Sequence, residues 1–257
     1  MRVERLHDME QYVLQKHTAS LEELAEKFHI SLNTVRRDVQ ELLKRGQLKK
    51  VYGGVSAFNA KASLPLSVRA ERQYAEKNAI GRLAATLVPD HTTVFLDSGS
   101  TTVHLLPYLV NKRNITLITH SLSALYEAAK YPNLNVIALG GQYSPSTASY
   151  VGASTLQTLS AMSIDMIFVA ASGVSIEQGM TNNTYFEAEL KRSVTSKNKN
   201  IILMADHTKF DSSALFTFCD LSRISTVVSD TLLPETYRLY FQQNDIHLHL
   251  TPAISPI

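Results

Sequence analysis

The sequence has few of the features that mark secreted or membrane proteins. Its 257 residues contain a single cysteine, Cys219, so no internal disulfide can form, which is typical of a cytoplasmic protein. No helix N-terminus or base is evident near Cys219, which favours a packed thiol over a nucleophile. No apolar run approaches the roughly 18 residues of a membrane span, and the charged start MRVERLHDME does not resemble a signal peptide. We therefore expect a cytoplasmic protein that does not contact membranes.

Motifs for metal binding and catalysis are also missing. No Cys/His cluster has zinc-finger spacing, and Gly-x-Ser-x-Gly is absent. His247 and His249 alternate near the C-terminus and could bind a metal from one strand face, but a half-exposed strand is the favoured interpretation. Glu187 and Glu189 lie two apart on a predicted helix, so they point in different directions and do not form an acid/base pair. We expect no enzyme activity, no metal site and no cofactor.

The net charge of +2 is small, but the positive charge is local. Residues 1–60 hold ten Lys and Arg against eight Asp and Glu, whereas residues 61–257 hold fifteen of each. Within 31–50, two acids face six cations: Arg36, Arg37, Lys44, Arg45, Lys49 and Lys50. A concentrated basic segment of this kind indicates a nucleic-acid contact.

Residues 20–54 predict a helix-turn-helix. Ser20 and Glu23 form a capping box for a first helix, and Ser31 caps a second helix that begins at Leu32 and ends near Gly46. The predicted buried stripe of the second helix is Leu32, Val35, Val39, Leu42 and Leu43. The opposite face carries Asn33, Thr34, Arg36, Arg37, Gln40 and Lys44. Cations and an amide on one helix face suit phosphates and base edges in the major groove.

Flanking segments extend this pattern to a winged helix-turn-helix over residues 1–58. Residues 3–17 predict a preceding helix, and two short extended runs around Gly53-Gly54 predict a hairpin wing. Tyr52 in the wing is either a hydrophobic brace or a phosphate donor. A small helical interaction domain with a solvated charged face is the alternative. The candidate DNA-binding residues are Ser31, Asn33, Thr34, Arg36, Arg37, Lys49, Lys50, Tyr52, Gly53 and Gly54.

The rest of the chain predicts a second domain of the α/β class. Residues 59–75 form a linker and the start of a connecting helix over 67–87. The predicted outward face of this helix carries Arg69, Glu71, Arg72, Glu76 and Lys77. From 76 to 257, short β-rich runs alternate with helical segments, which predicts a doubly wound, mostly parallel sheet with helices on both faces. The segments 143–150 and 172–183 are expected to be loops.

Ligands of such sheets bind beyond the carboxyl ends of the strands. The first predicted strand ends in the loop Asp97-Ser98-Gly99-Ser100-Thr101-Thr102, whose glycine, hydroxyls and helix N–H groups suit an anion. Further candidates at strand ends are Thr119, His120, Gly140, Asp206 and Lys209. Each could be an ordinary strand-to-helix turn, but together they favour a small phosphorylated or polyhydroxylated ligand.

The motifs resemble the DeoR family of bacterial regulators of sugar catabolism over nearly the whole chain. The resemblance is carried by Asn33-Thr34-Val35-Arg36-Arg37-Asp38-Val39, by the 97–102 loop and by 203–210, LMADHTKF. It implies a sensor domain similar to the ribose-phosphate isomerase fold, in which the Ser/Thr loop and Lys209 hold phosphate. Asp97, Thr119, Glu187 and Asp206 would then lie near hydroxyls. The N-terminal domain looks most like that of the inositol-catabolism repressors.

Two departures from the family pattern affect the identity of the ligand. His120 stands where the family often has asparagine, and Ala170-Ala171 replaces a common Gly-Ala pair. We expect a homodimeric or homotetrameric repressor that binds double-stranded operator DNA and is released by a phosphorylated sugar or polyol. The rival hypotheses are a sugar-phosphate isomerase with an attached DNA-binding domain and a non-specific nucleoid-type DNA binder.

Overall fold

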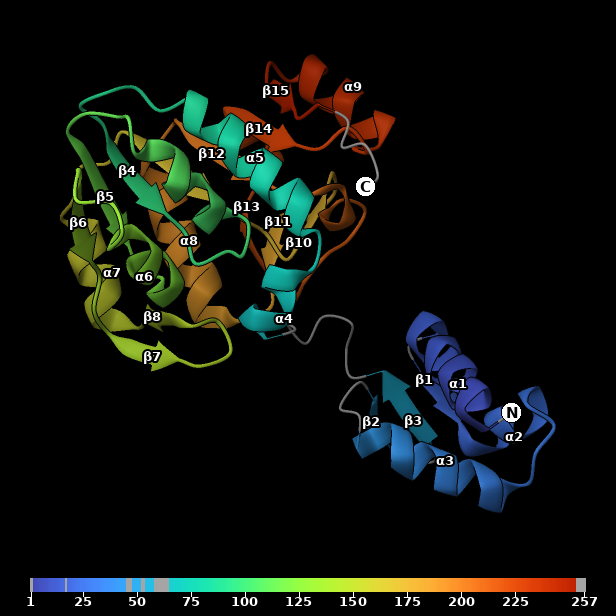
Figure 1. The fold of residues 1–257 in the computed structure, drawn as a ribbon. Coiled ribbons are helices and arrows are strands. Elements are labelled where there is room, and N and C mark those ends of the chain that lie inside the picture. Colours follow the sequence, from blue (N-terminus) through green and yellow to red (C-terminus); the bar gives the residue numbers. More distant parts are fainter. Residues whose placement is uncertain (1, 17, 45–47, 52–53, 58–64, 253–257) are drawn as a thin grey trace. The chain divides into compact units, whose positions relative to one another are not determined.

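The computed structural model describes residues 2–16, 18–44, 48–51, 54–57 and 65–252 (Figure 1). The chain divides into two compact units, Met1–Ala62 and Ser63–Ile257. The division falls inside the segment 59–75 that was expected to link the domains. Among the residues described, none of the helices has the length and apolarity that crossing a membrane requires.

The first unit is built on three helices, α1 (Arg2–Lys16), α2 (Leu21–Lys27) and α3 (Leu32–Lys44). The expected caps are present: the Glu23 amide donates to Ser20 Oγ at 3.0 Å, and the Thr34 amide donates to Ser31 Oγ at 3.3 Å. One apolar cluster joins the three helices to the wing, and its fully buried members include Met9, Val13, Leu24, Val35, Leu42 and Val55. The helix-turn-helix is therefore held by a core of its own.

The wing has three strands, one more than expected. Strand β3 (Gly54–Ala57) pairs antiparallel with β2 (Leu48–Val51) and with β1 (Thr18–Ser20). The extra strand β1 lies between α1 and α2, where the sequence carried no strand signal. A Cβ on Gly54 would lie 2.2 Å from the Ala19 carbonyl oxygen, so the close approach of β1 requires glycine at this position.

The second unit contains a seven-stranded parallel sheet, which confirms the predicted fold class. Its order is β15-β14-β12-β9-β4-β5-β6. The strands are β4 (Thr93–Leu96), β5 (Ile115–Thr119), β6 (Leu134–Ala138), β9 (Met166–Val169), β12 (Ile201–Met204), β14 (Thr226–Ser229) and β15 (His247–Leu250). The chain adds β5 and β6 on one side of β4 and all later strands on the other side. The direction of winding therefore reverses between β4 and β9.

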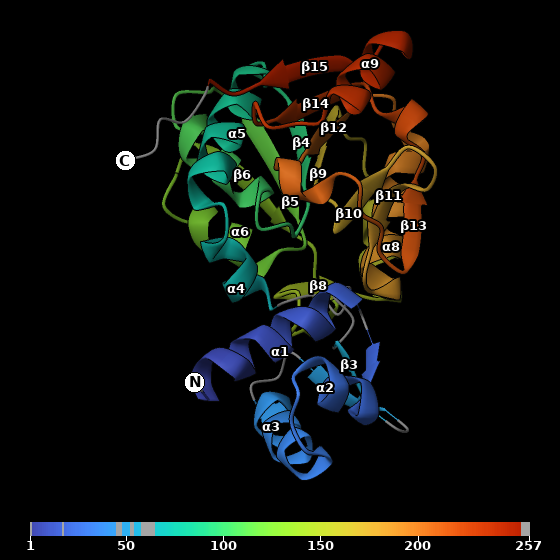
Figure 2. The same ribbon diagram turned by 90° about the vertical axis from the view of Figure 1, so that its right-hand side faces the viewer.

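Helices cover both faces of this sheet (Figures 1 and 2). On one face lie α5 (Tyr74–Thr86), the 3₁₀ helix η1 (Thr102–Leu109) and α6 (Leu122–Ala128), packed on Val94 and Leu96 of β4. On the other lie α7 (Ala153–Ser160), α8 (Tyr185–Lys197) and α9 (Glu235–Gln243), in the cluster that contains Phe95. Adjacent residues of β4 thus serve opposite layers, as the pleat of a doubly covered strand requires.

Several local expectations were wrong. The expected single helix 67–87 is two helices, α4 (Leu66–Glu71) and α5, because Gln73 adopts left-handed dihedrals with φ 50°. Lys77 of α5 is buried, and its ammonium donates to the carbonyls of Arg69 and Arg72. These bonds satisfy carbonyls at the end of α4 that a continuous helix would have bonded internally.

The two long segments expected to be loops contain strands. β7 (Gln142–Ser144) pairs with β8 (Ser149–Val151), and β10 (Gly173–Ser175) pairs with β11 (Gly179–Asn182). β11 also pairs with β13 (Phe216–Cys219) from much later in the chain. Two short 3₁₀ helices are also present. Helix η2 (His207–Lys209) follows β12, and helix η3 (Leu221–Arg223) follows β13. Pairing across the chain stabilises these segments, so local sequence does not reveal them.

Candidate functional site

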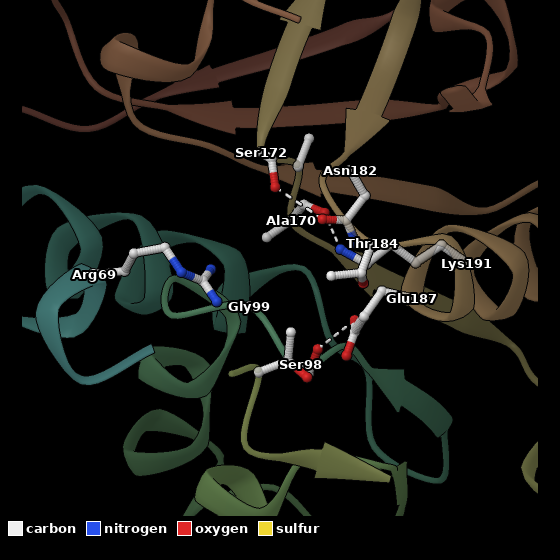
Figure 3. Close-up of a pocket in the computed structure, with 11 residues that line it drawn as sticks. Arg69, Ser98, Gly99, Ala170, Ser172, Asn182, Thr184, Glu187 and Lys191 are labelled. Carbon is white, nitrogen blue, oxygen red and sulfur yellow. Dashed lines mark hydrogen bonds between the residues drawn. The ribbon is translucent and has the colours of Figure 1, made fainter. Parts of the chain in front are cut away.

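The reversal of the sheet between β4 and β9 creates the place where a doubly wound fold binds ligands. A pocket lies at this place, and Ser98 and Gly99 follow β4 into it while Ala170 and Ser172 follow β9 (Figure 3). Its full lining is Arg69, Ser98, Gly99, Thr147, Ala170, Ala171, Ser172, Asn182, Thr184, Glu187 and Lys191. The space between these side chains holds little more than a water molecule, so the pocket is narrow.

Asp97 ties the two central strands together beneath the pocket. Its buried carboxylate accepts from the Ala170 amide at 3.1 Å, and its Oδ2 lies 2.9 Å from Lys191 Nζ. Lys191 also donates to the Ala170 carbonyl at 2.7 Å. Burial raises the pKa of Asp97, but Lys191 and His120 outweigh burial and hold that pKa well below its usual range. Asp97 is therefore an ionised structural partner.

His120 lies on the other side of Asp97. Its ring stacks on Phe95 at 5.9 Å between centroids, and its Nδ1 donates to the Tyr150 carbonyl at 3.1 Å. Its Nε2 faces Asp97 Oδ1 at 3.6 Å. Burial lowers the pKa of His120, whereas Glu187 and Asp97 raise it more, so the net direction is upward. Among the described residues, the Nε2 atom of His120 has no other partner than the Asp97 carboxylate, and a protonated imidazolium accounts for this arrangement.

Glu187 comes from the first turn of α8 and is also buried. One carboxylate oxygen accepts from Ser98 Oγ at 2.7 Å, and the other accepts from Ser149 Oγ. Ser149 in turn shares a 2.8 Å hydrogen bond with Thr147, which lines the pocket. The β7–β8 hairpin thus contributes hydroxyls that were not expected from the sequence, because the segment had been assigned to a loop.

Arg69 is the pocket residue whose position differs from the prediction. It was expected on the outer face of a connecting helix, but its guanidinium reaches from α4 into the pocket toward Gly99 (Figure 3). Burial lowers the pKa of Arg69, and Glu187 and Asp97 oppose this by raising it. An arginine stays protonated in such a setting, so two cations and the Glu187 carboxylate line the pocket, and the Asp97 carboxylate lies beneath it.

The same charges bear on metal binding. Asp97, His120 and Glu187 offer three ligand atoms within 4.8 Å of one another. Their two carboxylates already face Lys191 and Arg69, so a divalent cation would add two uncompensated buried charges. The arrangement suits a neutral or anionic polar ligand better than a cation.

The other candidate effector residues occupy three places. Thr102 Oγ1 donates to the carbonyls of Asp97 and Gly99 and so closes the 97–102 loop, in which Ser100 and Thr101 are also buried. Thr119 Oγ1 donates to the Leu96 carbonyl, linking β5 to β4. The Gly140 carbonyl accepts from Thr155 Oγ1, away from the pocket lining.

Asp206 and Lys209 lie at the end of β12, outside the pocket lining. Asp206 Oδ1 accepts from the Thr208 amide at 3.1 Å, and Asp206 Oδ2 lies 3.8 Å from Lys209 Nζ. Burial lowers the pKa of Lys77 to about 8, while Asp206 raises it and Lys209 lowers it. Lys77 is therefore a second cation near Lys209, and its predicted place on the outward face of the connecting helix was wrong, because Lys77 is buried.

The candidate DNA contacts lie on α3 and the wing. Asn33, Arg36 and Arg37 are exposed and Thr34 is half-buried. Lys50 is exposed on β2, and Lys49 belongs to the same strand, whereas Tyr52 and Gly53 lie outside the described residues. Leu32 is 38% exposed, so its assignment to the buried stripe was wrong; it stands in the first turn of α3, beyond the reach of the core.

Polar contacts fix α3 in place. The buried Asp38 carboxylate accepts from Arg5 of α1, with both Nε and Nη2 at 2.9 Å. The hydroxyls of Ser31 and Thr34 share a 2.9 Å hydrogen bond at the start of the helix. The exposed cations of α3 therefore project from a helix whose opposite side is anchored by ion pairing and apolar packing.

A helix-turn-helix with an exposed basic helix, joined to an α/β unit with a polar pocket at its switch point, defines a ligand-responsive DNA-binding protein. Residues 5–61 match the DeoR-like helix-turn-helix domain, and residues 72–231 match the DeoR C terminal sensor domain. The chain belongs to the DeoR family of transcriptional regulators.

Named relatives match nearly the whole chain. The HTH-type transcriptional regulator IolR of Bacillus subtilis is 36% identical over 97% of this chain and 100% of its own length. The glycerol-3-phosphate regulon repressor of Escherichia coli is 26% identical over 93% of this chain and 94% of its own. Among solved structures, a D-ribose-5-phosphate isomerase in complex with phospho-erythronic acid has a TM-score of 0.39 at 15% identity, covering 52% of each chain.

Proposed function

We propose that the protein is a DNA-binding repressor of a carbohydrate-catabolism operon, released from its operator by a phosphorylated sugar or polyol. The observation that carries the effector class is the pocket at the switch point. It combines hydroxyl and amide groups of Ser98, Ser172 and Asn182 with the cations Arg69 and Lys191. Lys191 has three N–H donors and uses two of them on Asp97 and Ala170.

The same geometry argues against the isomerase alternative. Proton abstraction needs a carboxylate whose pKa lies near the working pH. The pKa of Asp97 is held far below that range by Lys191, and both oxygens of Glu187 accept hydroxyl hydrogen bonds. We expect no interconversion of aldose and ketose phosphates by the purified protein, measured at substrate concentrations that saturate the pocket.

Arg69 supports a route from the pocket to the DNA-binding unit. Its helix, α4, is the first described element after the segment that links the two units. An anionic ligand in the pocket competes with Glu187 and Asp97 for the guanidinium, and a displacement of Arg69 that reaches its backbone moves α4. A ligand can shift a two-state equilibrium only through such a differential contact.

A thermal-shift screen tests the proposal. Ligands that bind only the native state raise the melting temperature by mass action. A free ligand concentration of a hundred times Kd stabilises the native state by about 2.7 kcal/mol. We expect stabilisation by sugar or polyol phosphates but not by the corresponding unphosphorylated compounds. Arg69→Ala should abolish the shift, whereas Arg113→Ala, at an exposed ion pair with Asp90, should not. Equal shifts with both classes of compound would refute the phosphate requirement.

A further inference from the structure

A group of large apolar side chains is exposed at the start of α8 and beside β13. Tyr185 is 50%, Phe186 51% and Leu215 73% exposed. The Tyr185 ring contacts the rings of Phe186 and Phe216, each at 5.7 Å between centroids. We call these three rings, together with Leu215 next to Phe216 in the chain, the aromatic patch. Water contacts three aromatic rings that pack on one another here, which is unfavourable unless another surface covers them.

The patch is large enough to anchor an interface. A buried aromatic side chain removes about 150–250 Å² from water, so half-exposed rings and a largely exposed leucine offer roughly 300–400 Å². The largest apolar patch on a typical monomer covers about 300–600 Å² and is often functional. A stable interface buries about 800 Å² on each partner, so the patch can supply the apolar centre and the surrounding polar residues the remainder.

The charges beside the patch point to a particular partner. Glu189 and Arg192 follow Tyr185 along the exposed side of α8, and the Tyr185 hydroxyl lies 3.5 Å from Glu189 Oε1. Arg192 donates to the Thr217 carbonyl of β13 and is thereby held at the border of the patch. One acid and one base on the same border make the surface complementary to itself, because a two-fold axis brings the acid of one copy to the base of the other.

We propose that the aromatic patch is covered by the same patch of a second copy of this chain. A helix-turn-helix reads one half-site, so two copies are needed to read a palindromic operator. Tyr185 and Phe186 also lie between Thr184 and Glu187, which both line the pocket. A ligand that moves this turn of α8 therefore changes self-association as well; this last consequence rests on the proposed function.

Sedimentation velocity of the full chain tests the proposal without any ligand. Phe186→Glu and Leu215→Glu should each weaken self-association by about thirty-fold or more, the effect of losing a central anchor, and give the mass of a single chain at micromolar concentration. Phe186→Leu keeps an apolar side chain and should retain the wild-type mass. The far-UV circular dichroism spectrum of the folded variants should match that of the wild type, because the replaced side chains are exposed.

Leu239 of α9 is the matched control, since it is 49% exposed on an element outside the patch. Leu239→Glu should leave the assembly intact. A monomeric wild-type chain, retention of the wild-type mass by both glutamate variants, or equal dissociation by Leu239→Glu would each overturn the proposal. If the glutamate variants dissociate while no sugar phosphate shifts the melting temperature, the interface stands and the proposed effector class fails.

Discussion

Replacing Lys191 by methionine should destabilise the sensor unit through a charge that is left behind. The ammonium of Lys191 is the 2.9 Å partner of Asp97, and it also donates to the Ala170 carbonyl at 2.7 Å. Methionine fills a similar volume but removes the ammonium that pairs with Asp97, so the buried carboxyl must either keep its charge without Lys191 or take up a proton. Breaking a buried ion pair on one side costs about 3–5 kcal/mol. At roughly 2–4 °C per kcal/mol for a unit of this size, the melting temperature should fall by about 6–20 °C.

The sequence has no tryptophan, so the unfolding transition is best followed by far-UV circular dichroism in urea. Lys130→Met is the control, because Lys130 makes an exposed ion pair with Glu127 in α6, and such pairs contribute about 0–1 kcal/mol. Adding Asp97→Asn to Lys191→Met should recover part of the loss by removing the unpaired charge. If Lys191→Met costs no more than Lys130→Met, the inferred pairing with Asp97 does not hold in solution.

Three further predictions concern DNA, effector and pH. Arg36→Ala should cost about 1–3 kcal/mol of operator affinity if its side chain contacts a guanine; fluorescence anisotropy that shows an equal loss on unrelated DNA would make it a phosphate contact. Lys209→Ala should leave operator binding intact but raise the sugar-phosphate concentration needed for release; an unchanged dose–response would exclude Lys209 from the site. The raised pKa of His120 should add stability that is fully present below pH 6.5, its ordinary pKa, and is lost as pH rises through the raised value. His120→Asn should remove that part of the decline, and urea titrations from pH 5 to 9 measure it.

Much of the fold was predictable because local and global signals agree. Ser20 and Ser31 stand where caps are needed, and each confirmed cap places the start of a helix to the residue. The apolar runs that became β4, β5, β9 and β12 are buried on both faces, so their composition alone marked them as central parallel strands. Placing the ligand site at strand ends then followed from the fold class.

The parts of the pocket that the sequence did not predict depend on contacts between distant segments. Arg69 belongs to a segment whose polar pattern predicts an exposed helix. The left-handed backbone at Gln73 and the hydrogen bonds of the buried Lys77 separate this segment from α5, and the guanidinium then reaches the pocket. Ser149 reaches Glu187, and Thr147 reaches Ser149, because β7 and β8 pair, and no local turn motif in the sequence predicts this pairing. Tertiary pairing decides such positions, so sequence periodicity could not have found them.

We expect the charges around the pocket to determine how an effector binds. Asp97 lies 2.9 Å from Lys191 Nζ, and Glu187 and Asp97 raise the pKa of both Arg69 and His120, so each carboxylate has cationic neighbours without a ligand. A phosphate group brings about −1.5 to −2 charges at neutral pH and cannot bind beside two carboxylates unless it takes cations from them. Lys191 of α8 is held by its contacts with Asp97 and the Ala170 carbonyl, which follow the ends of β4 and β9. Arg69, in contrast, belongs to a separate short helix. We therefore expect Arg69 to be the cation that follows a phosphate, and α4 to be the element that shifts if the movement of Arg69 reaches its backbone.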